Sequence, residues 1–104
     1  GSVAGNVLDA QGHPRHNALV ALVPDGELKQ RTDYYGAYQE TRTDQLGGFE
    51  IHAMTPGTYR AYAWQDAPAG AYRNEKFLAA FSAKGVPVQV GGGPSPRLDL
   101  KVLD

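Results

Sequence analysis

Glycine and proline interrupt this sequence so often that no long regular element fits between them. There are 13 glycines and 7 prolines among 104 residues. Turn signals such as Thr55-Pro56-Gly57 recur along the chain, because proline presets the first central φ angle of a turn and glycine supplies the positive φ of the second. Short segments separated by such turns predict an all-β fold.

The segments between the turns have the residue patterns of short strands. We expect seven of them, at residues 3–8, 18–23, 38–43, 49–54, 59–64, 86–90 and 98–103. A chain of this length supports one core, so the pattern predicts a single domain built as a seven-stranded antiparallel Greek-key β-sandwich. Pro87 cannot donate a ladder hydrogen bond, which places the strand at 86–90 at a sheet edge. In the strand at 49–54 we expect Ala53 to face inward and Met54 outward.

Residues 74–84 depart from the strand pattern. Phe77, Leu78 and Phe81 recur at helical spacing, Asn74 is placed as an N-cap, and Gly85 is placed as the stop. We therefore expect one short helix of two or three turns.

Two strands carry apolar or aromatic residues that a simple sandwich leaves uncovered. Residues 18–23 are apolar at every position, which is typical of a strand covered on both faces. In residues 59–64, Tyr59 and the two following alanines share one face, while Arg60, Tyr62 and Trp64 share the other. The second face of each strand therefore needs an explanation.

Two interpretations of that second face remain open. In one, the short helix lies over it, and Phe77 and Phe81 pack on Tyr62 and Trp64. In the other, flat rings beside polar groups form a stacking platform for a sugar or an extended peptide. The candidate ligand-binding residues are then Arg60, Tyr62, Trp64 and Tyr72.

Composition excludes several classes of function. The formal net charge is −1, from 10 basic and 11 acidic side chains, whereas a nucleic-acid binder needs a basic face. No apolar run approaches the ~20 residues of a membrane span. Cysteine is absent, which removes disulfides, zinc thiolates and cysteine nucleophiles.

The histidines and aspartates have simple structural explanations. His13 and His16 could approach a metal from one loop, but zinc sites normally need three or four ligands. Asp9, Asp44 and Asp66 lie near turns, where a carboxylate can bond the backbone two residues on. We therefore expect no metal site, no other cofactor and no catalytic residue.

Several motifs resemble carboxypeptidase regulatory-like domains. The opening of that family is similar to Val3-Ala4-Gly5-Asn6-Val7-Leu8-Asp9, Gly12-His13-Pro14 and Asn17-Ala18-Leu19-Val20. Its second signature resembles Thr43-Asp44-Gln45, Gly48-Phe49 and Pro56-Gly57-Thr58-Tyr59. The later part of the chain is similar to a variant found in large exported bacterial proteins. The resemblance implies a prealbumin-like (transthyretin-like) sandwich.

The resemblance also implies a role without chemistry. We expect a non-catalytic accessory domain of an exported bacterial protein, which is secreted, periplasmic or on the cell surface. It would act as a spacer or a docking module for other domains of the parent chain or for a protein partner, without inserting into a membrane. The alternative is a carbohydrate-binding module that uses the aromatic platform. Gly1-Ser2 resembles a cloning remnant, so we expect the domain to span residues 3–104 of an excised piece.

One enzyme with a similar architecture, hydroxyisourate hydrolase, is not matched by the residues that matter. Asn6 stands where that enzyme has a catalytic histidine, and Gly48 and Phe49 stand where it uses an arginine. Its Tyr-Arg-Gly-Ser tail is missing as well. We therefore expect no enzymatic activity.

Overall fold

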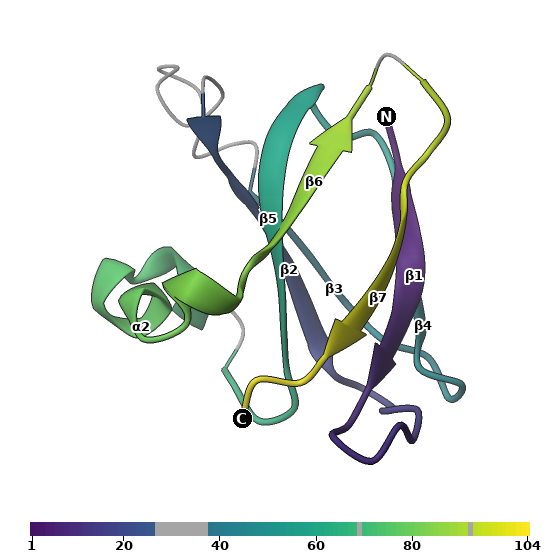
Figure 1. Ribbon diagram of the computed structural model, residues 1–104, viewed down its shortest axis with the longest axis vertical. Coiled ribbons are helices and arrows are strands. Elements are labelled where there is room, and N and C mark those ends of the chain that lie inside the picture. Colours follow the sequence, from purple (N-terminus) through teal and green to yellow (C-terminus); the bar gives the residue numbers. More distant parts are fainter. Residues whose placement is uncertain (27–37, 69, 92) are drawn as a thin grey trace.

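Within residues 1–26, 38–68, 70–91 and 93–104, which the computed structural model describes, seven strands form two sheets (Figure 1). In chain order they are β1 (Val3–Leu8), β2 (Leu19–Pro24), β3 (Gln39–Arg42), β4 (Gly48–Ile51), β5 (Gly57–Trp64), β6 (Val86–Val90) and β7 (Arg97–Lys101). The predicted all-β sandwich is therefore confirmed.

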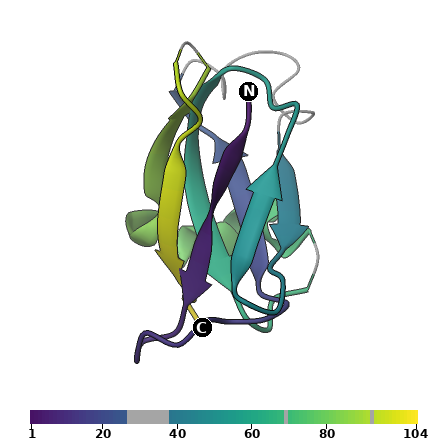
Figure 2. The same cartoon turned by 90° about the vertical axis from the view of Figure 1, so that its right-hand side faces the viewer.

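The two sheets are layered face to face. One has the strand order β4-β1-β7 and the other β3-β2-β5-β6. Figure 2 shows β1, β4 and β7 side by side in the layer nearer the viewer. Strand β6 is at an edge, as Pro87 predicts.

The expectation of a wholly antiparallel sandwich is wrong for one pair of strands. Strand β1 pairs antiparallel with β4 but parallel with β7, in a register that places Ala4 opposite Arg97. The reason is the connection before β7, since β6 belongs to the other sheet. Strands β1 and β7 are not consecutive in the chain and the connection into β7 crosses from the other sheet, so no hairpin fixes the direction in which β7 pairs with β1.

The space between the sheets is filled by one apolar cluster. Tyr59 is fully buried in it, and its hydroxyl donates to the carbonyl oxygen of Thr55. The cluster consists of Val3, Val7, Ala18, Val20, Leu22, Phe49, Ile51, Met54, Tyr59, Ala61, Ala63, Val88, Val90, Leu98 and Leu100. Both sheets contribute, and alternate residues of β2 and β5 point into it, as their sequence pattern predicts.

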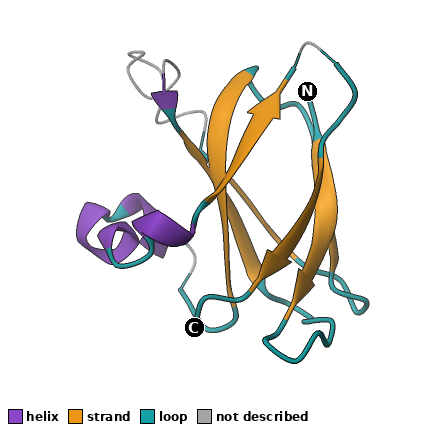
Figure 3. Cartoon of the chain, in the orientation of Figure 1, coloured by secondary structure: helices purple, strands orange, loops and turns teal. Residues whose placement is uncertain are grey.

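The predicted helix at 74–84 is present but is divided into two short pieces, and a further 3₁₀ turn precedes it. An α-helix, α2 (Glu75–Ala79), lies between two 3₁₀ turns, η2 (Ala71–Arg73) and η3 (Ser82–Lys84) (Figure 3). Asn74 caps α2 as predicted, because its side-chain oxygen accepts from the backbone N–H groups of Lys76 (2.9 Å) and Phe77 (3.2 Å). A continuous helix over 74–84 is wrong, since the backbone leaves α geometry at Phe81 (φ −119°, ψ 4°). No helix in the described residues is long and apolar enough to span a membrane.

Gly85 ends the helical segment for a different reason than the one predicted. Its φ is −67°, so no left-handed cap requires glycine there. A Cβ at this position would lie 2.7 Å from Cζ of the Tyr62 ring. Glycine is therefore needed because the chain passes tightly over that ring.

The predicted strand at 49–54 ends early. Strand β4 stops at Ile51, and Ala53 takes a left-handed φ of 58°. Ala53 is consequently exposed, whereas Met54 is turned into the core with 2% exposure. The expectation that Ala53 faces inward and Met54 outward is wrong, because a left-handed residue breaks the two-residue alternation of a strand.

Gly5 allows the close approach of β7 to β1. A Cβ on Gly5 would lie 2.1 Å from the carbonyl oxygen of Leu98. We predict that Gly5→Ala lowers the free energy of unfolding by about 1–3 kcal/mol, because the backbone of β7 would have to move. Urea unfolding measures the change.

The matched control is Gly93→Ala, since a Cβ on Gly93 meets nothing within 4 Å. We expect that variant to stay within about 0.5 kcal/mol of the original chain. Equal stability of the two variants would contradict the close packing of β1 against β7.

Candidate functional site

The aromatic row on the outer face of β5 lies beneath the helical segment. Trp64 is 0% exposed and Tyr62 is 3% exposed. The Trp64 ring centroid is 5.3 Å from that of Phe77, 5.5 Å from that of Phe81 and 5.5 Å from that of Tyr62. The first interpretation, a helix covering this face, is therefore confirmed, and the rings do not form an open platform.

This second apolar layer, which we call the covered cluster, also explains strand β2. Its buried members are Leu19, Ala21, Val23, Tyr62, Trp64, Ala67 and Tyr72. Alternate residues of β2 belong to it, and the others belong to the core between the sheets. Strand β2 is thus buried on both faces, as its continuous apolar sequence predicts.

Tyr72, the fourth candidate ligand-binding residue, is anchored at the edge of the covered cluster. It is 1% exposed, and its hydroxyl donates to Oε1 of Glu40 on β3 (2.8 Å). Its ring is stacked on Tyr38, with the guanidinium of Arg73 5.1 Å above the Tyr38 ring. Burial, with help from the bond to Glu40, raises the pKa of the Tyr72 hydroxyl. These contacts fasten the helical segment to β3.

Arg60 is the candidate residue that stays accessible. Its Nε–H donates to Oδ2 of Asp25 (3.0 Å), and the two side chains are 42% and 34% exposed. Arg60 and Tyr62 lie together on a pocket of about 430 Å³ where α2 and η3 meet the end of β2 and the middle of β5. Of the four candidate residues, Arg60 is accessible at this pocket and Tyr62 lines it with little exposure, whereas Trp64 and Tyr72 are buried away from it.

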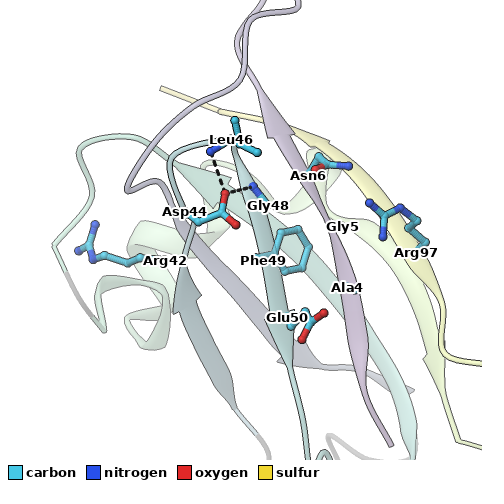
Figure 4. A pocket seen from close by; sticks show the side chains of 10 residues that line it. All are labelled: Ala4, Gly5, Asn6, Arg42, Asp44, Leu46, Gly48, Phe49, Glu50 and Arg97. Carbon is cyan, nitrogen blue, oxygen red and sulfur yellow. Dashed lines mark hydrogen bonds between the residues drawn. The ribbon is translucent and has the colours of Figure 1, made fainter.

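A larger hollow lies on the opposite side of the molecule, on the outer face of the β4-β1-β7 sheet (Figure 4). We call it the outer-face hollow, and its volume is about 530 Å³. Small residues, Ala4 and Gly48, leave space on its floor, and Leu46 stands beside it with 80% exposure. The residues that line it are Ala4, Gly5, Asn6, Arg42, Asp44, Leu46, Gly48, Phe49, Glu50 and Arg97.

Asp44, which lines this hollow, stabilises the loop between β3 and β4 through its side-chain carboxylate. Its Oδ1 accepts from the backbone N–H groups of Leu46 and Gly48, both at 2.9 Å (Figure 4). These bonds stabilise the charged form and lower the pKa of the carboxyl below its ordinary value of 3.8. Asp9 makes the same kind of turn with Gln11 and His13, and its pKa is lowered too. The turn role predicted for both residues is confirmed.

The remaining polar candidates are dispersed. His13 lies 3.5 Å from Asp9, and His52 lies 3.1 Å from Glu50, at exposed positions. The backbone N–H of Asp66 donates to the carboxylate of Asp104 (2.9 Å). Across the described ranges, no three His, Asp or Glu side chains come close enough together to hold a metal ion.

The molecule is thus a two-layer β-sandwich domain with one sheet covered by a helical segment and the other sheet open. The sequence model of polysaccharide lyase family 4, domain II, matches residues 12–88, and the chain belongs to this family. The resemblance to carboxypeptidase regulatory-like domains is supported only as far as a β-sandwich family. No curated protein matches the chain.

Solved structures share the fold at low sequence identity. A candidate carbohydrate-binding protein from Pseudomonas aeruginosa has a TM-score of 0.57 and 19% identity, over 97% of this chain and 87% of that one. A DUF3823 family protein from Bacteroides ovatus has a TM-score of 0.57 and 15% identity, over 97% and 44%. The major pilin subunit of Bacillus cereus has a TM-score of 0.54 and 10% identity, over 98% and 29%. This chain therefore spans less than half of the last two.

Two features of these surfaces are missing from the sequence-based expectations. Asp25 is not among the candidate residues expected from the sequence, yet it lies two residues beyond Val23, which pairs with Arg60 across the sheet. Knowledge of the β2–β5 pairing would have placed both charges on one face. The outer-face hollow combines β1, β4 and β7, and no local signal in the sequence connects those strands.

We predict that the hydrogen bonds accepted by the Asp44 carboxylate make the free energy of unfolding depend on pH in the acidic range. A lowered pKa in the folded state means that the contribution is complete above about pH 4 and is lost as the pH falls through the folded value. The stability difference between the original chain and Asp44→Asn should therefore shrink on acidification below pH 4. Denaturant unfolding between pH 2 and pH 7 measures it.

The control is Asp66→Asn, because the Asp66 side chain makes no hydrogen bond in the described structure. Its difference from the original chain should be small, because no side-chain hydrogen bond is lost. A constant Asp44→Asn difference over the whole range would show that the charge of Asp44 does not hold the loop.

Proposed function

We propose that this chain is a non-catalytic accessory domain of a larger exported bacterial protein, and that it serves as a spacer or docking module. The observation that carries the proposal is the contrast between the two sheets. The helical segment covers the outer face of β2 and β5, whereas no described segment covers the outer face of β1, β4 and β7, which is hollowed. The bare face is the surface that a second domain can cover.

The comparisons support membership of a larger assembly. The family is the second domain of a polysaccharide lyase family, and the chain spans 44% and 29% of two structural neighbours. A domain embedded in a longer chain needs a surface for its neighbours. The proposed partner of the outer-face hollow is therefore another domain of the parent chain.

The chemistry of the outer-face hollow suits a protein partner. Arg42 and Arg97 are balanced by Asp44 and Glu50, and Leu46 is an exposed apolar side chain beside them. An interface typically has an apolar centre with a polar, solvent-accessible rim. Balanced charge also disfavours a nucleic acid, which attracts basic surfaces.

The same residues are poorly placed for acid–base catalysis. Asp44 uses its Oδ1 to hold two backbone N–H groups, and its lowered pKa makes it a weak base. A general base works best with a pKa near the operating pH. We therefore propose no catalytic residue.

Three finer expectations from the sequence also belong to this proposal. These are the Greek-key connectivity, the specific carboxypeptidase regulatory-like resemblance, and the extent of a single domain over residues 3–104. A secreted, periplasmic or cell-surface location is also proposed. The resemblance to pilins in fold supports it.

A second candidate function is carbohydrate binding. It is favoured by the family, which is named for a polysaccharide lyase, and by a structural neighbour described as a candidate carbohydrate-binding protein. The binding site cannot be the aromatic platform considered from the sequence, because the Trp64 and Tyr72 side chains are buried. A sugar would have to use Arg60, which stays accessible, beside Tyr62, which lines the same pocket.

Hydrogen–deuterium exchange on the isolated chain and on the full parent protein tests the docking function. We predict slower exchange in the parent protein at Ala4, Asn6 and Leu46, because a second domain would cover the outer-face hollow. The helical segment at 71–84 serves as the internal control and should exchange equally in both. Equal exchange at the hollow would leave the spacer role and contradict docking.

A further inference from the structure

We propose that the pocket beside Arg60 binds one ring of a neutral sugar. This inference rests on the carbohydrate-binding candidate described above, and it assigns a site and a ligand class to it. The pocket, which we call the Arg60 pocket, is lined by Val23, Pro24, Asp25, Arg60, Tyr62, Leu78, Ser82 and Ala83 and has a volume of about 430 Å³. It lies where η3 approaches the end of β2 and the middle of β5.

Arg60 and Asp25 present unused hydrogen-bonding groups in this pocket. One of the five N–H donors of Arg60, at Nε, is directed to Oδ2 of Asp25, and the terminal nitrogens have no partner in the described structure. Oδ1 of Asp25 likewise accepts no bond there. The pair therefore offers donors and an acceptor within a few ångströms of each other.

The hydroxyl of Tyr62 is the second observation that points to a ligand. The residue is 3% exposed, yet within the described part of the chain its hydroxyl makes no hydrogen bond. Among the described side chains, Trp64 Nε1 is the polar atom that is both fully buried and without a hydrogen-bond partner. The Tyr62 oxygen also has no partner there but is not fully buried, so it keeps some access to the space beside it. Arg60 and Asp25 are near enough for their charges to act on this hydroxyl. Buried hydroxyls normally have a partner, and here a ligand would supply it.

The charge balance of the pocket selects the class of ligand. Arg60 and Asp25 neutralise each other at 3.0 Å, so neither an anion nor a cation gains a net attraction. Vicinal sugar hydroxyls both donate and accept, which matches the donors of Arg60, the acceptor of Asp25 and the dual capacity of the Tyr62 hydroxyl. The apolar side chains of Val23, Pro24 and Leu78 can cover the C–H surface of the ring. These features favour a neutral pyranose.

The first test is an NMR titration of the ¹⁵N-labelled chain with methyl glycosides of glucose, galactose, mannose and rhamnose. We expect at least one of them to shift the amide signals of Asp25, Tyr62 and Ser82. The methyl glycoside of galacturonic acid is the charged comparison, and it should bind no more tightly than the neutral glycosides, because Asp25 neutralises Arg60 and a carboxylate gains no net attraction. Acetylated dipeptide amides test whether the pocket prefers a peptide.

The sharpest variant is Tyr62→Phe, because it removes the unpartnered hydroxyl and little else. We expect sugar affinity to fall about threefold to tenfold, the loss that one hydrogen bond gives, while the melting temperature stays the same. The matched control is Tyr59→Phe, which makes the same chemical change in the core between the sheets and should leave affinity unchanged. Ala83→Trp places a large side chain at an exposed position of the pocket and should block binding.

The outcomes separate the site from the function. Sugar-dependent shifts at the Arg60 pocket that weaken in Tyr62→Phe and persist in Tyr59→Phe would support the proposal. Sugar binding at other residues, or binding equally strong in Tyr62→Phe, would overturn the pocket but keep the carbohydrate-binding function. Shifts at the pocket with the dipeptide amides alone would overturn the sugar as its ligand. No shift with any probe would overturn both the pocket and the carbohydrate-binding function, and the docking role would stand.

Discussion

The packing of Phe77 and Phe81 on Trp64 decides which surfaces of this domain are free. A sheet with an aromatic outer face would otherwise expose Tyr62 and Trp64 to water, and large apolar patches of that kind are unusual on soluble domains. The helical segment removes them, and Tyr72 fastens its start to β3 through Glu40. Strand β2 and the second half of β5 are therefore buried on both faces, while the sheet of β1, β4 and β7 keeps a polar outer face.

This asymmetry gives the two proposed functions separate surfaces. The outer-face hollow on β1, β4 and β7 has balanced charges around a floor of small residues, which suits another folded domain. The Arg60 pocket lies on the opposite sheet, beside the helical segment, and holds a neutralised ion pair with an unpartnered tyrosine hydroxyl. A neighbouring domain and a sugar ring could therefore be accommodated by the same fold without competing for one site.

Much of the fold could be predicted because it depends on local pattern. The continuous apolar run of β2 indicated cover on both faces, the spacing of Phe77 and Phe81 indicated the helix, and Asn74 marked its start. The errors come from non-local or backbone effects. The parallel pairing of β1 and β7 depends on how the chain crosses between sheets, and the left-handed Ala53 turned Met54 into the core. Candidate sites were harder to predict for the same reason, since Asp25 and Arg60 come together only because of the register in which β2 pairs with β5.

Fluorescence emission reports directly on whether the helical segment covers Trp64, because Trp64 is the one tryptophan in the chain. With its ring enclosed by Phe77 and Phe81 and its Nε1 without a hydrogen-bond partner in the described structure, the indole is in an apolar environment. Fluorescence with acrylamide titration should show blue-shifted emission and weak quenching in the native chain, with both changing on unfolding in urea. Red-shifted, readily quenched emission from the native chain would show that the helical segment does not cover this face.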